Sequence, residues 1–346
     1  PCGTLFPYTT LFRSGHGRIA LGRGAEFDLI RKLLGPEGDL PPEVLVGPGD
    51  DCLVVEGGWV LSTDLAVEGV HFRREWVTLE EAAYRAVAGG LSDLAAMAAE
   101  PVSVLLSLAL SPASAAKKGP LLQAGADEAC REAGCRILGG DLARSQGPLM
   151  MSVVALGRAD SPVLRTGSRP GDEVWVTGRL GGSGGAVALW TRGEEPSESL
   201  REAFVAPRPR IREAVWLSRR ATLHGLIDLS DGLAGDAGHL AAASGVSVIL
   251  DPDAIPIHPL LREVCPSRED ALSLGLRGGE DYELCLTVSP GTLEEWAGPF
   301  QDSFGIPLSR VGRVEAGEGV FLAGKGGSER LPVGGGFNHF EGEEAG

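Results

Sequence analysis

The chain has 346 residues, of which 43% are hydrophobic, so it is long enough and apolar enough to bury the cores of two ordinary domains. Its formal net charge is −16, which argues against a nucleic-acid partner, because nucleic-acid-binding proteins present a basic surface to the phosphates. No apolar run reaches the roughly 18 residues of a membrane-spanning helix, so we expect no membrane partner either.

An unusual segment stands at the start of the chain. The letters LFPYTTLFRS at 5–14 are similar to the translation of a sequencing-adapter oligonucleotide. The segment lacks the basic start and the uninterrupted apolar stretch of a signal peptide. We therefore expect residues 1–14 to be a translation artefact without a functional role.

Hydrophobic periodicity predicts alternating helices and strands in the first half of the chain. Helices are predicted at 25–34, 79–99 and 120–134. Strands are predicted at 47–55, 59–67, 102–111, 135–141 and 149–157. We expect the strand at 135–141 to be buried and to end in a glycine turn.

The polar, turn-rich segment 158–172 predicts a domain boundary, because the pattern restarts after it. Strands are predicted at 174–180, 246–252, 283–289 and 319–324, a glycine turn leading into a helix at 181–190, a helix at 208–223, and a strand, tight turn and helix at 225–245. Alternation in both halves predicts an α/β or α+β architecture with one domain over 20–160 and another over 161–346.

Six cysteines are scattered along the chain: Cys2, Cys52, Cys130, Cys135, Cys265 and Cys285. None belongs to a CxxC pair, and the spacing of Cys130 and Cys135 has no second pair to complete a zinc site. This pattern predicts reduced thiols and a cytoplasmic location.

The placement of aspartates at or near the edges of apolar elements is the strongest chemical signal. The residues are Asp50, Asp51, Asp64, Asp93, Asp141, Asp228 and Asp231. Any one of them can be a turn residue or a helix cap. A buried carboxylate is costly unless a cation or hydrogen bonds compensate it. Several together indicate an acidic cleft for magnesium, which prefers carboxylate and phosphate oxygens.

The common nucleotide motifs are absent from the sequence: there is no GxxxxGK[ST] and no intact GxGxxG. Bound phosphates would therefore be held chiefly through metal. Arg144 and Arg165 follow or precede glycine turns and are either phosphate ligands or surface residues. His71, seven residues after Asp64, either faces the same cleft or is structural.

Taken together, the segments resemble the thiamine-monophosphate kinase family, whose superfamily includes aminoimidazole ribonucleotide synthetase and selenophosphate synthetase. The matching segments, in family order over about 25–340, are EFDLI, GDD, STDLAVEGVHF, LSDLAAMAAEP, GGD, RTGSRPGD, VTGRLG, IDLSDGL, GGEDYELCLT and GFNHF. Within the superfamily, GGEDYEL and VEGVHF are specific to this kinase, whereas GDD and SDGL are less so.

The resemblance implies an α/β (α+β) fold of two domains, like that of aminoimidazole ribonucleotide synthetase. The N-terminal mixed-sheet domain would bind ATP and magnesium and form a homodimer through its sheet, and the C-terminal domain would be α/β. The implied activity is the ATP-dependent phosphorylation of thiamine monophosphate to thiamine diphosphate, by direct in-line transfer assisted by several magnesium ions.

Site residues carry over by matching motif. The implied magnesium ligands are Asp51, Ser62, Thr63, Asp64, Asp93, Asp141, Asp228 and Asp231. The implied ATP-binding residues are Gly140, Asp141, Arg165 and Ser230, and Asp64, Asp93 and Asp141 are implied to be catalytic. The implied substrate-binding residues are His71, Glu280 and Phe337.

The chain departs from the family pattern at a few positions. Gly89-Gly90 replaces the usual residues before LSD, and Phe337 stands where tryptophan or tyrosine is usual. Two alternatives remain open. Another ATP-dependent enzyme of the superfamily would not be expected to contain GGEDYEL and GFNHF. A non-catalytic nucleotide- or metal-binding protein would be expected to lack some of the aspartates.

Overall fold

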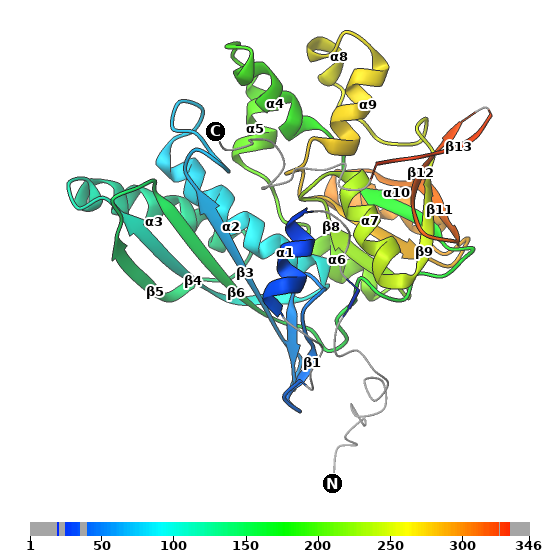
Figure 1. Cartoon of the computed structure of the whole chain (residues 1–346), viewed down its shortest axis with the longest axis horizontal. Coiled ribbons are helices and arrows are strands. Elements are labelled where there is room, and N and C mark those ends of the chain that lie inside the picture. The colour runs from blue at the N-terminus through cyan, green and yellow to red at the C-terminus, as the bar shows by residue number, and fades with distance from the viewer. Residues whose placement is uncertain (1–18, 21–24, 35–39, 325, 333–346) are drawn as a thin grey trace.

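The computed structural model describes residues 19–20, 25–34, 40–324 and 326–332 of the chain. The predicted artefact at 1–14 and the predicted substrate residue Phe337 lie outside these residues. The described part contains one six-stranded and one seven-stranded mixed sheet, with helices packed on them (Figure 1). The predicted α/β (α+β) fold class is confirmed.

The six-stranded sheet belongs to the first half of the chain. Its strands are β1 (Val44–Val46), β2 (Leu53–Val55), β3 (Trp59–Val67), β4 (Glu100–Leu110), β5 (Ile137–Arg144) and β6 (Met150–Arg158), in the order β1-β2-β3-β6-β4-β5. β4 and β5 are parallel and the other neighbours are antiparallel. The first-half helices are α1 (Ala25–Leu34), α2 (Leu79–Ala96) and α3 (Ala115–Glu132).

One face of this sheet is covered and the other is open. α2 packs on β3 and β6, and α3 packs on β4 and β5. Val60, Leu106 and Val153 point toward these helices and are buried. Leu65 and Leu105 point the other way and are exposed, because successive side chains of a strand alternate between its faces.

The seven-stranded sheet forms the second half. Its strands are β7 (Glu173–Thr177), β8 (Gly225–Asp228), β9 (Val246–Leu250), β10 (Leu284–Val288), β11 (Leu308–Ala316), β12 (Gly319–Gly324) and β13 (Gly327–Arg330), in the order β13-β12-β9-β11-β7-β10-β8. The helices are α4 (Gly182–Thr191), α5 (Glu198–Val205), α6 (Ile211–Ser218), α7 (Leu233–Ser244), α8 (Leu261–Val264), α9 (Arg268–Arg277) and α10 (Glu294–Phe304). β7 to β10 are buried along their whole length, which explains their continuous apolar runs.

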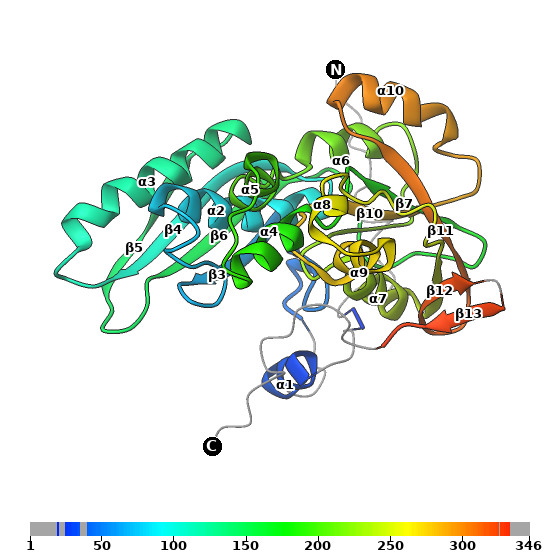
Figure 2. The same cartoon turned by 90° about the horizontal axis from the view of Figure 1, so that it is seen from above.

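The two halves meet at α2. This helix contacts the six-stranded sheet, and it also contacts α5, α6 and β8 of the second half. Figure 2 shows the two sheets at opposite ends of the molecule, with α2, α5 and α6 between them. Among the residues that the structure describes, none of the helices could span a lipid bilayer.

Most predicted elements are observed, and three of the differences bear on the site. The helix expected at 79–99 ends at Ala96, because Ala98 has φ 51° and β4 already begins at Glu100. Asp64 lies within β3 rather than at its end. The strand predicted as buried at 135–141 is the edge strand β5, which runs to Arg144 with Gly139, Gly140 and Asp141 inside it and is almost wholly exposed. An edge strand with no covering helix on one side cannot be told from a buried strand by its apolar residues alone.

Candidate active site

Helix α2 presents polar groups along one face to the second half of the chain. It begins with a capping box, in which the Thr78 hydroxyl accepts a hydrogen bond from the Glu81 N–H and the Glu81 carboxylate accepts one from the Thr78 N–H. Arg85, Gly89 and Asp93 follow at intervals of four residues and therefore share one face of the helix.

The glycine pair Gly89-Gly90 lets α2 lie close to the sheet. A Cβ atom on Gly90 would come within 2.9 Å of the Val153 Cγ1, and one on Gly89 within 2.9 Å of the Asp64 Oδ2. Both distances are shorter than ordinary van der Waals contact. The two glycines therefore leave room for Val153 and for the Asp64 carboxylate under the helix.

Three predicted magnesium ligands meet beside α2. One carboxylate oxygen each from Asp51, Asp93 and Asp228 lies within 4.8 Å of the others. They come from the turn between β1 and β2, from α2 and from the end of β8. The Ser62 hydroxyl donates a hydrogen bond to Asp93, and the Ser92 hydroxyl donates one to Asp228 at 2.6 Å. Two hydroxyl groups thus orient the carboxylates of this acidic cluster.

Arg165, a predicted ATP-binding residue, is paired with the acidic cluster. Its Nε and Nη2 donate to the two Asp51 oxygens at 2.9 and 2.5 Å. Its backbone N–H donates to Asp50 at 3.1 Å. The guanidinium therefore contacts a carboxylate in this structure, and an incoming phosphate would have to share it with Asp51.

Burial and mutual repulsion raise the pKa values of two of the clustered carboxyl groups, those of Asp93 and Asp228. The pKa of Asp228 rises to about 7, mainly because burial disfavours its charged form, and Asp51 adds to the shift. The pKa of Asp93 is raised by burial and by the charge of Asp228. If all three carboxylates are ionised, they outnumber the single positive charge of Arg165, so a bound cation would stabilise this excess of negative charge. Hard oxygen donors with such an excess are the ligand set that Mg²⁺ takes, so the residues fit a magnesium site.

A cavity of about 430 Å³ next to the acidic cluster brings most of the predicted residues together. Its predicted lining residues are Asp64, His71, Asp93, Asp228, Ser230, Asp231 and Glu280, and it is also lined by Arg73, Trp76, Phe204 and Tyr282. The lining comes from both halves of the chain.

At His71, the Val67 N–H donates to Nδ1 at 3.0 Å, which leaves Nε2 to carry the proton of the neutral ring.

The turn at 279–282 supplies Glu280 in a strained conformation. Glu280 has φ 54° and Tyr282 has φ 50°, values that residues with a Cβ atom rarely adopt. Backbone hydrogen bonds hold the turn, since the Glu280 N–H donates to the Ser230 carbonyl at 2.7 Å and the Tyr282 N–H to the Leu229 carbonyl at 2.9 Å. The buried Arg85 pairs with the Glu280 carboxylate at 2.7 Å.

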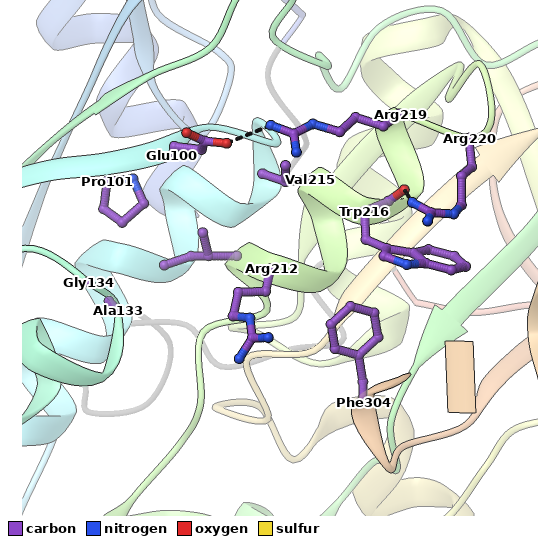
Figure 3. Close-up of a pocket in the computed structure, with 11 residues that line it drawn as sticks. Glu100, Pro101, Ala133, Gly134, Arg212, Val215, Trp216, Arg219, Arg220 and Phe304 are labelled. Atoms are coloured by element: carbon purple, nitrogen blue, oxygen red, sulfur yellow. Dashed lines mark hydrogen bonds and ion pairs between the residues drawn. The ribbon is translucent and has the colours of Figure 1, made fainter. Parts of the chain in front are cut away.

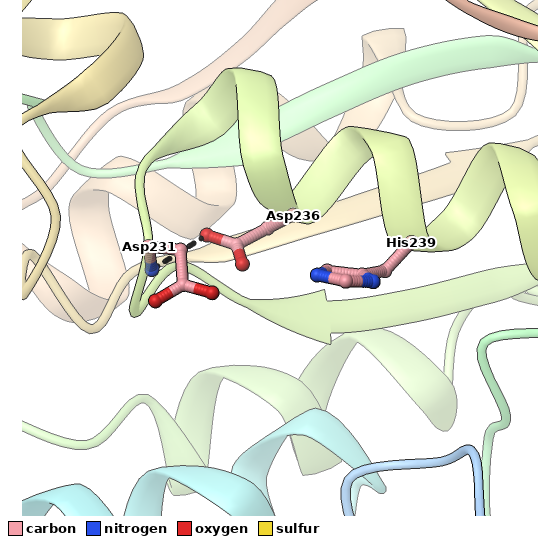
Figure 4. A group of neighbouring side chains, drawn as sticks. All are labelled: Asp231, Asp236 and His239. Atoms are coloured by element: carbon pink, nitrogen blue, oxygen red, sulfur yellow. Dashed lines mark hydrogen bonds between the residues drawn. The ribbon is translucent and has the colours of Figure 1, made fainter. Parts of the chain in front are cut away.

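Asp231 belongs to a second group of ligand-type side chains (Figure 4). Ligand atoms of Asp231, Asp236 and His239 lie within 4.8 Å of one another. The Asp236 carboxylate accepts a hydrogen bond from the Asp231 N–H at 3.1 Å. Burial lowers the pKa of His239 to about 3, so the ring is neutral. Asp236 therefore fixes the backbone at the start of the loop that carries Asp231.

Three predicted residues lie away from the cavity. Thr63 follows the inward-facing Ser62 on β3, so its side chain points to the open face of the sheet. Gly140 and Asp141 lie on β5, three strands from β3, and Asp141 is aligned with Ser107. A single chain does not bring Asp141 or Thr63 to the acidic cluster.

Several residues of the site were not predicted from the sequence. Arg85, Ser92 and Asp236 each contact a predicted residue. One available signal is that Arg85 is the sole charged residue in the segment AAYRAVAGGL of α2. A charge at a position with buried neighbours on both sides requires a partner.

A larger cavity, of about 560 Å³, lies elsewhere between the two halves (Figure 3). It is lined by Arg212, Trp216, Arg220 and Phe304 among others, and Glu100 pairs there with Arg219 at 2.7 Å. None of the predicted site residues lines it. We therefore assign the chemistry to the smaller cavity, because the clustered carboxylates are there.

Comparisons with known families and proteins agree with the two-half organisation. A family model described as AIR synthase related protein, N-terminal domain, matches residues 49–159. The corresponding C-terminal domain model matches residues 169–325. Thiamine-monophosphate kinase of Rhodopirellula baltica is 34% identical over 294 residues, which cover 81% of this chain and 86% of the relative. That of Pyrococcus horikoshii is 32% identical over 296 residues, covering 85% and 91%.

Solved structures are similar over almost the whole chain. The structure of AaThiL complexed with AMPPCP and TMP has a TM-score of 0.77 and 32% identity, and the match covers 92% of this chain and 97% of that one. The structure of tt0281 from Thermus thermophilus has a TM-score of 0.77 and 34% identity, with coverage of 89% and 98%. A HypE–HypF complex, at 17% identity and a TM-score of 0.73, is similar in fold alone.

Proposed function

This chain belongs to the thiamine-monophosphate kinase family, and on that premise we propose that it transfers the terminal phosphoryl group of ATP to thiamine monophosphate. The products are thiamine diphosphate and ADP. The observation that carries the proposal is the cavity that joins the acidic cluster to His71 and Glu280. A kinase needs this combination, with a metal–nucleotide site on one side and an acceptor site on the other.

The proposed magnesium ligands are the clustered Asp51, Asp93 and Asp228, with Ser62, Asp64 and Asp231 beside them. Bound magnesium would neutralise phosphate charge as it spreads during the transfer. The chain's own residues orient this site. Ser62 and Ser92 hold two of the carboxylates by hydrogen bonds, and Arg165 holds Asp51.

The transfer itself is proposed to be direct and in line. A terminal phosphate oxygen of thiamine monophosphate forms a bond to the γ-phosphorus of ATP, and the bond from that phosphorus to the ADP oxygen breaks. The attacking oxygen is already ionised near neutral pH, so the chain has no proton to remove. The lining residues therefore serve to bind and align the two anions rather than to act as nucleophile or general base.

The substrate side of the cavity suits a cationic ring. The thiazolium ring of thiamine is positively charged, and Glu280 offers a carboxylate in a cavity that Trp76 and Phe204 also line. His71 lines the same cavity and can donate through Nε2. Phe337, which the resemblance also implies for this side, lies outside the described residues.

We also propose a homodimer formed through the open face of the six-stranded sheet. Leu53, Leu65 and Leu105 are exposed on that face, and exposed apolar side chains gathered on one face of a sheet favour an interaction site. Thr63 and Asp141 share the same face by register. A partner there would give both residues a neighbour that a single chain lacks.

The proposed cytoplasmic location still rests on the cysteine pattern.

The test is an ADP-release assay with magnesium and ATP. We expect release that requires thiamine monophosphate and yields thiamine diphosphate, compared with thiamine, an aminoimidazole ribonucleotide precursor and no acceptor. Release that depends instead on the aminoimidazole precursor would assign the chain to another activity of the superfamily. Binding of magnesium and ATP without turnover on any acceptor would support a non-catalytic nucleotide-binding protein.

A further inference from the structure

Arg85 is a charged residue in an apolar place. It lies in the middle of α2, where the neighbouring residues Ala83, Ala86, Val87 and Ala88 are buried, and it is itself only 5% exposed. A guanidinium cannot lose its charge, so its burial is unfavourable unless a partner compensates it. The position of Arg85 therefore depends on what it contacts.

Its contacts are one carboxylate and one aromatic face. Nη2 lies 2.7 Å from the Glu280 Oε2, and the guanidinium carbon lies 3.5 Å from the centroid of the Phe204 ring. The Arg85 Nη1 is buried without a hydrogen-bond partner among the described residues, so the compensation comes mainly from Glu280 and Phe204. Both partners belong to the second half of the chain, whereas Arg85 belongs to the first.

The Glu280 side chain contacts both Arg85 and the cavity. Its side chain is 28% exposed and lines the cavity, whereas Arg85 is not among the lining residues. A substrate in the cavity can thus touch Glu280 but not Arg85. Any effect of Arg85 on the substrate must pass through the carboxylate that it holds.

The backbone at Glu280 makes this support necessary. Gly279, Glu280 and Tyr282 all have positive φ values, of 65°, 54° and 50°. A left-handed conformation is unfavourable for residues with a Cβ atom and persists only where the surroundings hold it. The backbone bond from Glu280 to Ser230 holds the main chain, but among the described residues the carboxylate is held by Arg85.

An aromatic column fixes the plane of the guanidinium. Phe204 packs edge-on against Trp190 with 5.3 Å between centroids, and Trp190 stacks on Trp76 at 5.4 Å. Trp76 and Phe204 also line the cavity. A planar guanidinium can stack on Phe204 and direct an N–H toward Glu280 at the same time, which a lysine ammonium cannot reproduce.

We propose that Arg85 is a positioning residue of the proposed kinase: from α2 it holds the Glu280 carboxylate in the acceptor half of the cavity, ready for the cationic ring of thiamine monophosphate. The inference rests on the proposed function of the cavity. It assigns to Arg85 an effect on acceptor binding and not on ATP binding.

The test is steady-state kinetics of Arg85→Met and Arg85→Lys with thiamine monophosphate and with ATP. For Arg85→Met we expect the KM for thiamine monophosphate to rise at least tenfold, with the KM for ATP changed less than twofold. Arg85→Lys keeps the positive charge but loses the planar guanidinium that lies on Phe204. We therefore expect its KM for thiamine monophosphate to lie between the values of wild type and Arg85→Met. Arg201→Met is the matched control. Arg201 also joins the two halves, through paired bonds of 2.6 and 2.7 Å to Glu81, but neither residue lines this cavity.

A double-mutant cycle separates positioning from general loss of structure. If Arg85 acts through Glu280, Arg85→Met should add less than twofold to the KM for thiamine monophosphate once Glu280→Gln is present. Additive effects, equal rises in both KM values, or an Arg85→Lys enzyme indistinguishable from wild type would overturn the inference. Wild-type enzyme without thiamine-monophosphate-dependent ADP release would instead overturn the proposed function, and the inference with it. If Arg85→Met does not fold, Arg85→Lys and Glu280→Gln complete the same cycle.

Discussion

Asp93 lies between two other carboxylates and accepts its hydrogen bond from Ser62. We expect Asp93→Asn to reduce turnover by about 100-fold or more, because it removes one of the clustered magnesium ligands. In metal-free buffer the same change should not lower the melting temperature. Burial, and after it the charge of Asp228, raises the pKa of Asp93, so its charged form is unfavourable there and a neutral asparagine avoids both the desolvation and the repulsion.

ADP release measures the loss of turnover, and thermal denaturation in buffer with EDTA measures the melting temperature without metal. Asp64→Asn is expected to reduce turnover similarly, and Asp253→Asn, an exposed residue paired with Arg268, should leave it unchanged. Near-normal turnover of both the Asp64 and Asp93 variants would contradict the shared-metal site. A Tm for metal-free Asp93→Asn well below that of wild type would contradict the repulsion argument.

Burial raises the pKa of the Asp281 carboxyl group to about 7. Its carboxylate accepts from the Gly181 N–H at 2.7 Å, beside the start of α4. In the unfolded chain an aspartate has a pKa of about 4, so folding takes up a proton between about pH 4 and 7. Stability should therefore fall as the pH rises through that window, and should not change further on this account above pH 7.

Asp281→Asn keeps an oxygen acceptor for Gly181 and removes the titration. We expect its free energy of unfolding, measured with urea in EDTA, to exceed that of wild type by an amount that grows from about pH 4.5 to 7. The final difference should be a few kcal/mol, following the pKa difference. Asp302→Asn, an exposed change on α10, should follow the wild-type curve. Parallel curves for Asp281→Asn and wild type would rule out the raised pKa.

Aspartates at a turn, inside a helix and at a strand end predicted an acidic cleft, and Asp51, Asp93 and Asp228 do meet. Their positions in short motifs made them recognisable. Arg85 was not predicted, because its partner Glu280 is distant in sequence and no local pattern connects the two. Thr63 and Asp141 were predicted from motifs as well, yet strand alternation and sheet order place them on the open face.

At the scale of elements, α2 has the best-defined start. Thr78 and Glu81 form a capping box, whereas Ser114 at the start of α3 makes no capping bond with its side chain. We expect Thr78→Ala to lower the free energy of unfolding by about 1 kcal/mol, because one helix N–H loses its acceptor. Ser114→Ala is the matched control and should change it by a few tenths at most. Urea unfolding of both variants checks this, and equal losses would show that the capping box is not what stabilises α2.

Element boundaries were predictable where local chemistry sets them. The helix at 25–34 and the strand at 59–67 are found at the predicted residues. The helix α5 was missed, because it has only eight residues and one apolar face, and its neighbour α6 is shorter than predicted. The burial of β5 was not predictable, because sheet order decides it: a strand whose pattern is apolar becomes an exposed edge when nothing pairs on its far side.

At the scale of the whole molecule, the open face of the six-stranded sheet is the feature that a single chain leaves unexplained. Leu65 is 49% exposed and Leu105 is 43% exposed, although both lie inside long central strands. The opposite face of the same strands is buried under α2 and α3. A sheet with one covered face usually exposes polar residues on the other. The apolar residues here therefore favour a partner surface, and a second copy of the chain offers the same surface in return.

We expect Leu65→Glu and Leu105→Glu to convert a wild-type dimer into monomers, because each places a charge in a surface that pairing would bury. Light scattering coupled to size exclusion measures the mass directly. Leu121→Glu changes an exposed leucine of α3, away from the open face, and should leave the mass unchanged. Since Thr63 and Asp141 share the open face, the monomeric variants should also lose turnover while remaining folded, with a melting temperature lowered only by the loss of association. A wild-type protein that is monomeric and fully active would exclude the dimer, and would mean that Asp141 has no part in the reaction.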